Sequence, residues 1–410
     1  MYNSNRPNQY VEIREVSWVT RIKESLKGTV AGIVIIVIAF LLLIGNEARH
    51  DVNALANNQR TPEIVHISSD SAPSSQDIIG KPISMTGYIS TQEMLGDNLF
   101  LKPGSYIALT RQVEMYAWEE SRDVEATTHI GGSQTQQITA TYTKKWLPAR
   151  HLDSEWTSLL DNDLSVVRST KSRNFLQPEN HSNPPLEIED AGYRVSSAKV
   201  GIYDIDMNSF SLSVVGRETL PTPTPIQLKE EIVNIAPNIN LSHNYLYKGT
   251  GSSSTPQVGD LRIQYNALPS GTDVTVMGKL TSENRIVPYP YRISSLFRIF
   301  PSSLENARVK IEQENIYYTW GYRLLGFLLM WFGLRLLVEP FNILLDILPI
   351  FGAISRIISG YTTLLIASSL TLVTILVYRL TFNLLFVAIA IPITFISVMI
   401  GVIVFLSKRR

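Results

Sequence analysis

Long stretches without charged residues constrain this chain more than any other feature of its sequence. The first runs from Gly28 to Asn46 and has the apolar centre IVIIVIAFLLLI. As a helix it would extend about 28 Å, close to the ~30 Å hydrocarbon core of a bilayer. A cleaved signal peptide would be shorter, would begin nearer the N-terminus and would end in small residues. Because Asn-Glu-Ala-Arg follows directly, we predict an uncleaved transmembrane helix at residues 29–46.

The C-terminal third contains further stretches of this kind. Residues 357–378 and 380–407 are uncharged runs, each long enough to span a bilayer, with Arg379 alone between them. A shorter apolar run at 324–334 becomes a span if it is extended to 318–338 and its flanking arginines reach toward the lipid headgroups. We therefore predict four transmembrane helices, at 29–46, 318–338, 357–378 and 380–407.

Basic residues at the two ends predict the orientation of these spans. Five Lys or Arg residues occur in the cytoplasmic N-terminal segment, residues 1–28, and the tail, residues 408–410, reads Lys-Arg-Arg. The positive-inside rule places both termini in the cytoplasm, which an even number of spans allows. Residues 47–317 then form an extracytoplasmic domain. Residues 339–356 are apolar but contain a proline and an aspartate, and we predict an interfacial segment on the cytoplasmic side.

The large extracytoplasmic domain is predicted to be rich in β-strands. Apolar residues alternate with polar ones from Ile107 to Ala117, except at Arg111, and again from Gln136 to Trp146. This period of two is typical of half-buried strands, and Gly131-Gly132-Ser133 between them predicts a long hairpin. A second strand pair is predicted at 258–267 and 273–280. With a helix predicted to lead from residue 304 into the membrane, the fold class is an α-helical membrane region with a β-rich, α+β extracytoplasmic domain.

The sequence offers no positive case for catalysis, a metal or a cofactor. Basic and acidic residues number 36 each, so the chain lacks the excess positive charge of a nucleic-acid-binding protein. It contains no cysteine, and its six histidines are scattered without the spacing of a metal site. The pair Glu119-Glu120 is interpreted as a charged strand end. A Ser-His-Asp site stays open because geometry rather than sequence defines it.

Residues at the membrane edges are the candidate functional residues. Glu47 and Arg323 flank the outer ends of two predicted spans, and we predict that they form an ion pair there. Simple anchoring to headgroups is the alternative for both residues. The predicted interfacial anchors are Trp320, Leu344, Leu348 and Phe351. Small residues would allow close approach of helices, within this chain or between copies: Gly352, Ala353, Ser355, Ser359, Gly360, Ser368 and Ser369.

Several segments, in order along almost the whole chain, resemble the transmembrane protein 43 (LUMA) family. The segment 25–49 resembles the family's N-terminal anchor, although Ala48 stands where a glycine is expected. The strand Thr110–Glu120 resembles an Arg-x-Val-Glu-Met-Tyr-x-Trp motif. Further matches are Ala140–Trp146, Val258–Arg262, Trp320-Gly321 and Ser369–Leu372.

The resemblance implies four spans, a periplasmic or lumenal domain and a non-enzymatic organiser of membranes. Eukaryotic members of the family lie in the endoplasmic reticulum and inner nuclear membrane, self-associate and bind emerin and lamins. Those partners would apply here only if the chain is eukaryotic. The absence of cysteine favours a bacterial inner membrane.

We therefore predict an integral membrane scaffold that binds itself, membrane lipids and membrane proteins, without a cofactor and without nucleic acid. The alternatives are a transporter or channel component and a membrane-tethered enzyme of the cell envelope.

Overall fold

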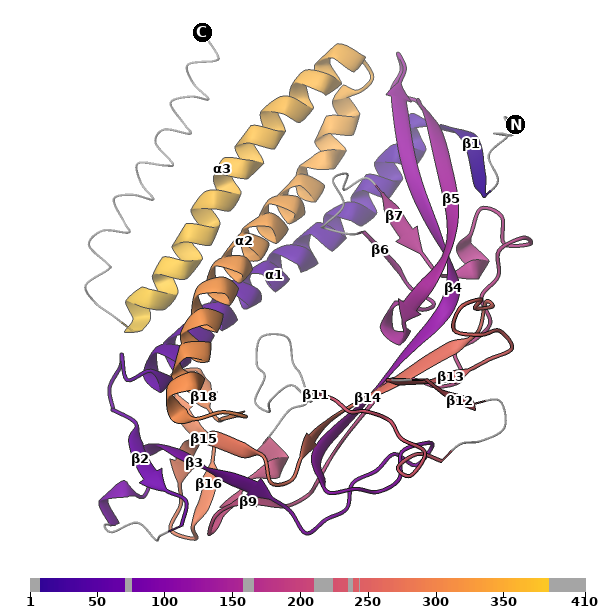
Figure 1. The fold of residues 1–410 in the computed structure, drawn as a ribbon. Helices are drawn as coiled ribbons and strands as arrows, with labels where there is room; N and C mark the ends of the chain where they lie inside the picture. The colour runs from indigo at the N-terminus through magenta and orange to yellow at the C-terminus, as the bar shows by residue number, and fades with distance from the viewer. Residues whose placement is uncertain are drawn as a thin grey trace.

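The computed structural model describes residues 8–70, 76–157, 166–209, 224–234, 239–242 and 244–382. Three long helices lie side by side, and a β-rich part contacts them at both ends (Figure 1). The helices are α1 (Trp18–Ala56), α2 (Leu304–Leu345) and α3 (Pro349–Phe382), which we together call the helical block. All three are long and apolar enough to cross a membrane.

Local sequence signals explain where these helices begin. The side chain of Ser17 caps α1 by accepting a hydrogen bond from the backbone N–H of Thr20 at 3.2 Å. Pro349 is the first residue of α3, a position at which a helix does not need a backbone donor. The fourth predicted span, 380–407, lies outside the described residues beyond Phe382.

The helices differ in length from the predicted spans. Helix α1 extends beyond both ends of 29–46, and α2 includes both the predicted lead-in helix and the span 318–338. The segment 339–356, predicted as a separate interfacial element, is divided between two helices. Residues 339–345 are the last residues of α2, residues 346–348 form a turn, and residues 349–356 are the first residues of α3. The turn is short because a proline restarts the helix at once.

Two sheets make up most of the β-rich part. The strands of the larger sheet are β1 (Gln9–Val16), β4 (Tyr106–Thr128), β5 (Gln134–Pro148), β6 (Glu155–Thr157), β7 (Val167–Ser169), β8 (Ala191–Arg194), β11 (Thr224–Pro225), β12 (Ile239–Ser242), β13 (Tyr245–Lys248) and β14 (Leu261–Pro269). Those of the smaller sheet are β2 (Val65–Ser68), β3 (Pro82–Ser90), β9 (Ala198–Val200), β10 (Tyr203–Ile205), β15 (Asp273–Leu280), β16 (Arg285–Val287) and β19 (Arg298–Phe300).

Short elements complete the described fold. The strands β17 (Tyr289–Tyr291) and β18 (Ser294–Leu296) pair only with each other. Four 3-10 turns are η1 (Gln76–Ile78), η2 (Ala149–His151), η3 (Ser172–Asn174) and η4 (Met207–Ser209).

The predicted long hairpin is confirmed, whereas the second predicted strand pair is wrong. Strands β4 and β5 pair antiparallel from Glu114–Pro148 to Thr128–Gln134. We call these two strands the long hairpin. Strands β14 and β15 are consecutive but belong to different sheets, β14 pairing with β4 and β15 with β3. Local alternation of apolar and polar residues predicts strands but does not predict which other strand each one pairs with. The Pro-Ser-Gly turn connects β14 in one sheet to β15 in the other.

The smaller sheet packs against the ends of two helices. Val52, Leu55 and Ala56 of α1 and Ala307 and Ile311 of α2 form a buried cluster with residues of β15, β18 and β19. Each sheet also has its own apolar core, centred on fully buried residues such as Met85 and Ile263. The helical block is therefore attached to the β-rich part by apolar packing at this end.

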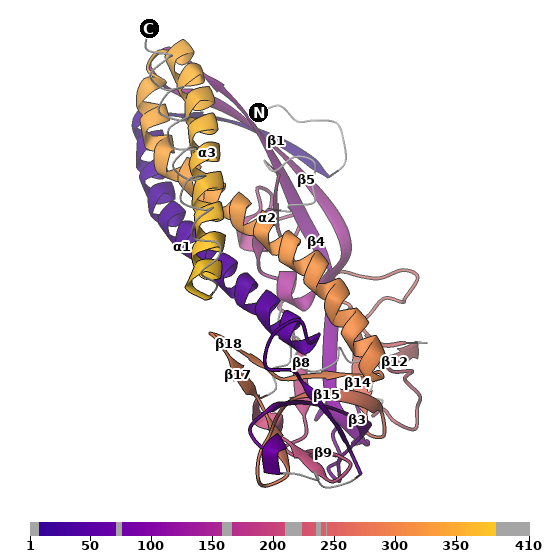
Figure 2. The same cartoon turned by 90° about the vertical axis from the view of Figure 1, so that its left-hand side faces the viewer.

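The N-terminal strand joins the long hairpin at the opposite end of the helical block. Strand β1 pairs antiparallel with β5, from Gln9 opposite Thr141 to Val16 opposite Gln134. The hairpin tip reaches the turn between α2 and α3, where the backbone N–H of Gly131 donates to the carbonyl of Ile347 at 2.9 Å (Figure 2). Residues predicted to lie on opposite sides of the membrane thus form one continuous sheet.

Candidate functional site

A buried acid at one end of the helical block joins all three helices. Glu47 of α1 is 1% exposed, and Arg323 of α2 donates to both of its carboxylate oxygens, at 2.7 and 3.0 Å. Arg379 of α3 donates to the same carboxylate at 3.0 Å. The structure thus brings together the two residues of the predicted membrane-edge pair and adds a third. We call these three residues the Glu47 cluster.

A second cluster of the same composition lies at the other end. Asp346, at the C-terminal cap of α2, is fully buried and accepts from Arg21 of α1 at 2.5 Å and from Arg356 of α3 at 2.8 Å. Arg21 also donates to the backbone carbonyl of Gly132 at the hairpin tip, at 2.6 Å. We call Asp346, Arg21 and Arg356 the Asp346 cluster. It joins the three helices to one another and to the long hairpin.

The two clusters share one arrangement of charges along the three helices. Each helix contributes one charged residue to each cluster, and the two charges lie about seven helical turns apart in α1 and about six in α2 and α3. At ~1.5 Å per residue the clusters are separated by about 35 Å along α2 and α3. The sequence prediction had found only one of the four ion pairs, because charges in different uncharged runs carry no signal of which of them meet.

Glycines bring α1 and α2 into backbone contact, a feature that the sequence prediction missed. A Cβ atom on Gly32 would lie 2.7 Å from the carbonyl oxygen of Gly333, and one on Gly333 would lie 2.7 Å from Ile36. A Cβ on Gly326 would likewise lie 2.6 Å from Leu43. The spacing Gly28-x-x-x-Gly32, typical of close helix crossings, is the signal that could have indicated this contact.

The predicted anchor residues are exposed at the surface of the helical block. Trp320 is 67% exposed, and the guanidinium of Arg323 lies 4.9 Å from its ring centroid. Leu344, Leu348 and Phe351 are 46%, 52% and 59% exposed and surround the turn between α2 and α3. This placement fits contact with lipid, since the described residues leave about half or more of each side chain uncovered.

The predicted helix-packing residues divide into two groups. Gly352 is buried, and a Cβ there would lie 1.8 Å from Oδ1 of Asp346, so this glycine makes room for the Asp346 cluster. Ser359 is half-buried and donates to Asn342 at 3.2 Å, and Ser369 is half-buried. Ala353 is exposed, and nothing lies within 4 Å of a Cβ built on Gly360. Within the described residues, Ala353 and Gly360 are open to another helix, and the predicted Ser368 is exposed as well.

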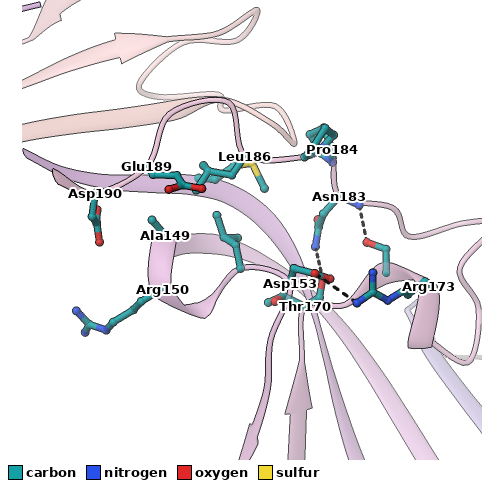
Figure 3. A pocket seen from close by; sticks show the side chains of 14 residues that line it. Ala149, Arg150, Asp153, Thr170, Arg173, Asn183, Pro184, Leu186, Glu189 and Asp190 are labelled. Carbon is teal, nitrogen blue, oxygen red and sulfur yellow. Dashed lines mark hydrogen bonds and ion pairs between the residues drawn. The ribbon is translucent and has the colours of Figure 1, made fainter. Parts of the chain in front are cut away.

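A pocket in the β-rich part was not predicted from the sequence. It has a volume of about 760 Å³ and lies beside η2 and η3 (Figure 3). Arg173 and Asp153 point toward each other across it at 3.4 Å, and Glu189 and Arg150 also line it. Its wall combines charged groups with prolines and leucines. Such a lining fits a polar segment of a partner better than a small apolar ligand.

A buried network explains the one polar residue that interrupts the alternation of β4. Arg111 donates to Asp97 at 2.6 Å, and the Tyr265 hydroxyl donates to the same carboxylate at 2.6 Å. Burial favours the neutral acid, but these bonds and the backbone N–H of Leu99 outweigh it and lower the pKa of Asp97. Burial and this carboxylate together raise the pKa of Tyr265. The network satisfies the buried charges of Arg111 and Asp97 and so stabilises the fold.

The pair Glu119-Glu120 was predicted to be a charged strand end but lies inside strand β4. Both side chains are buried within the long hairpin, at 1% and 0% exposure. Arg168 donates to Glu119 at 2.8 Å, and the Tyr142 hydroxyl donates to Glu120 at 2.5 Å. Period-two reasoning fails here because both consecutive side chains have partners within the protein: Lys145 and Arg168 contact Glu119, and Tyr142 and the backbone N–H of Leu176 donate to Glu120. Among the described residues, no group of three histidine or acidic side chains is arranged to hold a metal ion.

Three apolar helices that are long enough to cross a bilayer, held by ionic clusters and attached to two β-sheets, define an integral membrane protein of the α+β class. Comparison with known sequences identifies the family. The pattern of the family described as Transmembrane protein 43 matches residues 167–384, more than half of the chain. The chain belongs to the transmembrane protein 43 family, as its resemblance predicted.

The similarity to individual relatives is low in identity but extends over most of the chain. Transmembrane protein 43 of Homo sapiens is 23% identical over 387 residues, which cover 90% of this chain and 88% of the human protein. The Transmembrane protein 43 homolog of Drosophila melanogaster is 25% identical over 331 residues, 79% of this chain and 80% of that protein. No solved structure gives a significant match.

Proposed function

We propose that this protein is a non-enzymatic membrane scaffold that organises lipids and proteins through its helical block and its β-rich part. The observation that carries this proposal is the pair of ionic clusters, which hold the three helices at both ends. Buried charges arranged in this way fix one relative position of the helices and disfavour others. A rigid block presents a constant surface, which a scaffold needs. A transporter would instead need helices that move relative to one another.

The outer surface of the helical block supports binding of lipids and of further copies. An apolar groove of about 390 Å³ lies between α2 and α3, lined by residues such as Phe351, Ile354 and Ile358. Among the described residues nothing covers Ala353 or the space beside Gly360 of α3, which allows close approach by another helix. Small residues beside an apolar groove are typical of helix contacts in membranes. We place self-association on this face of α3.

The pocket beside η2 supports the second half of the proposal, binding of a partner protein by the β-rich part. Its charged and apolar lining suits a peptide segment. The same pocket is the observation that favours the alternative of an envelope enzyme. That alternative requires an acid or base held against a substrate. Asp153 forms an exposed ion pair with Arg173 at 3.4 Å, and Glu189 also lines the pocket.

Co-isolation of two differently tagged copies tests self-association. The copies are expressed together, transferred into lipid nanodiscs large enough for several copies, and isolated through one tag. We expect the second tag to be retained by the wild type and lost by Ala353→Leu, because the larger side chain separates the α3 faces. Ala31→Leu, the same change at an exposed position of α1, is the control and should retain it. Absence of the second tag from the wild type would contradict self-association.

A further inference from the structure

One arginine of the helical block, Arg49, has no acid as a partner among the described residues. It is half-buried and lies just before the part of α1 that packs against the smaller sheet. Its Nη2 donates to the neutral oxygens of Asn46 and Thr319, at 3.1 and 3.3 Å. Its Nε is buried without an acceptor, and Nη1, which is not fully buried, donates to none of the described residues. A guanidinium in this state still requires an anion.

The acids that form ion pairs at this end of the helical block are already bound to other arginines. Glu47 pairs with Arg323 and Arg379, Asp51 with Arg60 and Arg292, and Glu314 with Arg298. Five arginines thus share three acids, and Arg49 is a sixth cation beside them. This local excess of positive charge attracts an anion and repels the ammonium group of a zwitterionic headgroup.

The side chains around Arg49 are of the kind that lies at the headgroup level of a bilayer. The ring centroids of Tyr318 and Tyr322 of α2 lie 5.4 and 5.5 Å from its guanidinium carbon. Tyr318 is 48% exposed, and Trp320 on the same helix is 67% exposed. Exposed tyrosine and tryptophan near the end of a spanning helix are typical of the membrane interface. The anion nearest to Arg49 in a membrane is therefore a headgroup phosphate.

An uncovered apolar strip leads from Arg49 along α1 toward the middle of the helix. Gly45 and Leu41 precede Arg49 at intervals of four residues, which places all three on one face. Nothing lies within 4 Å of a Cβ built on Gly45, and Leu41 and Ile38 are 65% and 49% exposed. A lipid with its headgroup at Arg49 would lay an acyl chain along this strip. A free anion would leave the strip unused.

We propose that Arg49 binds the phosphate group of an anionic phospholipid, one acyl chain of which lies over Gly45 and Leu41. The two tyrosine rings hold the planar guanidinium in position, and its fork of donors matches the geometry of a phosphate. This inference names the class of lipid and rests on the lipid-binding part of the proposed function. Self-association through α3 does not depend on it, because the co-isolation of two tagged copies measures that property separately.

Native mass spectrometry of the full chain in a neutral detergent tests the proposal. The protein is titrated with phosphatidylglycerol, with zwitterionic phosphatidylcholine and with inorganic phosphate. We expect phosphatidylglycerol to bind about 10-fold or more tightly than phosphatidylcholine. Inorganic phosphate at the same concentration should not displace it. Equal binding of the two lipids would overturn the preference for an anionic lipid, and displacement by inorganic phosphate would overturn a lipid as the source of the anion.

Two substitutions by glutamine locate the binding. Arg49→Gln should weaken the binding of phosphatidylglycerol about 10-fold or more, through the loss of a charged hydrogen bond. Lys310→Gln removes a positive charge from an exposed position of α2 and should bind the lipid as the wild type does. Equal weakening in both variants would indicate attraction by overall charge and would contradict a site at Arg49.

A substitution that keeps Arg49 provides an independent measurement. Gly45→Glu places a carboxylate four residues before Arg49, the order that favours an ion pair within a helix. This carboxylate should take the place of the phosphate and weaken the binding of phosphatidylglycerol. Gly45→Gln, which has the same size without the charge, should weaken it less. Undiminished affinity in Gly45→Glu, or in a folded Arg49→Gln, would overturn the proposal.

Discussion

At the scale of single residues, the helical block depends on two buried acids that are each shared by two arginines. Glu47 and Asp346 are almost completely withdrawn from solvent. A buried carboxylate is tolerated only when hydrogen-bonded cations replace its lost hydration. The arginines of each cluster come from the other two helices. Removing an acid therefore leaves two buried cations without a counter-charge.

We expect Glu47→Gln to lower the free energy of unfolding by about 3–5 kcal/mol, the usual cost of breaking a buried ion pair. Thermal unfolding in nanodiscs measures the effect. Glu339→Gln is the matched control, since Glu339 is 35% exposed and lies 3.8 Å from Arg356. A half-exposed pair of this kind contributes at most about 1 kcal/mol. Equal stability of both variants would show that the Glu47 cluster does not hold the helices.

Acid should destabilise the β-rich part through carboxylates whose pKa is lowered in the folded protein. Hydrogen bonds lower the pKa of Asp97 below its ordinary 3.8, and those from Ser196 and Ser197 lower the pKa of Glu93 to about 2. Such groups stabilise the fold above their ordinary pKa, and this stabilisation is lost as the pH falls toward the folded value. The contribution of these two carboxylates to the free energy of unfolding should thus be constant above about pH 5 and decrease from there to pH 2.

Urea unfolding at several pH values, monitored by tryptophan fluorescence, checks this dependence. The variant Glu93→Gln should show a weaker decrease between pH 4.5 and pH 2 than the wild type. A variant at an exposed carboxylate outside these networks, Glu283→Gln, should follow the wild type. A wild-type stability that does not change over this range would contradict the assignment.

At the scale of elements, the crossing of α1 and α2 depends on glycine. Gly32→Ala places a methyl group 2.7 Å from a backbone oxygen of α2, which cannot move aside without separating the helices. We expect a loss of about 1–3 kcal/mol in the free energy of unfolding. Gly45→Ala in the same helix meets nothing within 4 Å and should be neutral or slightly stabilising. Thermal unfolding of both variants measures the difference. Equal free energies of unfolding for Gly32→Ala and Gly45→Ala would exclude close packing at Gly32.

The elements themselves were largely predictable from the sequence, and their partners were not. Uncharged runs predicted the helices, and the period of two predicted β4 and β5, because each depends on residues close in the chain. The separation of β14 and β15 into two sheets depends on which distant surface each strand buries. For the same reason, Arg379 was taken as an isolated charge although it completes the Glu47 cluster.

At the scale of the whole molecule, the helical block and the β-rich part are held together at both ends. Beside β15, apolar packing acts together with ion pairs such as Arg298 to Glu314 at 2.7 Å, and charged hydrogen bonds act at the hairpin tip. The second attachment includes the side chain of Arg21, which donates both to the carbonyl of Gly132 in the hairpin and to the carboxylate of Asp346. Loss of that side chain should release the tip while the other end stays attached.

We expect Arg21→Met to increase hydrogen exchange of the backbone amides at residues 129–134 by about 10-fold or more, since a charged hydrogen bond contributes roughly 1.5–3 kcal/mol. Hydrogen–deuterium exchange in nanodiscs, read by mass spectrometry, measures this change. Lys23→Met, the loss of an exposed cation of the same helix, should leave the exchange unaltered. Unchanged exchange in Arg21→Met would show that the tip is held by other contacts.

The most direct test of the central claim is the mass of the particle extracted from its native membrane into nanodiscs, with its lipids identified. A scaffold that binds copies of itself through α3 should give a mass that is a multiple of the 46.0 kDa chain, with the same lipids in repeated preparations. A single chain without a reproducible set of lipids or proteins would contradict the scaffold function.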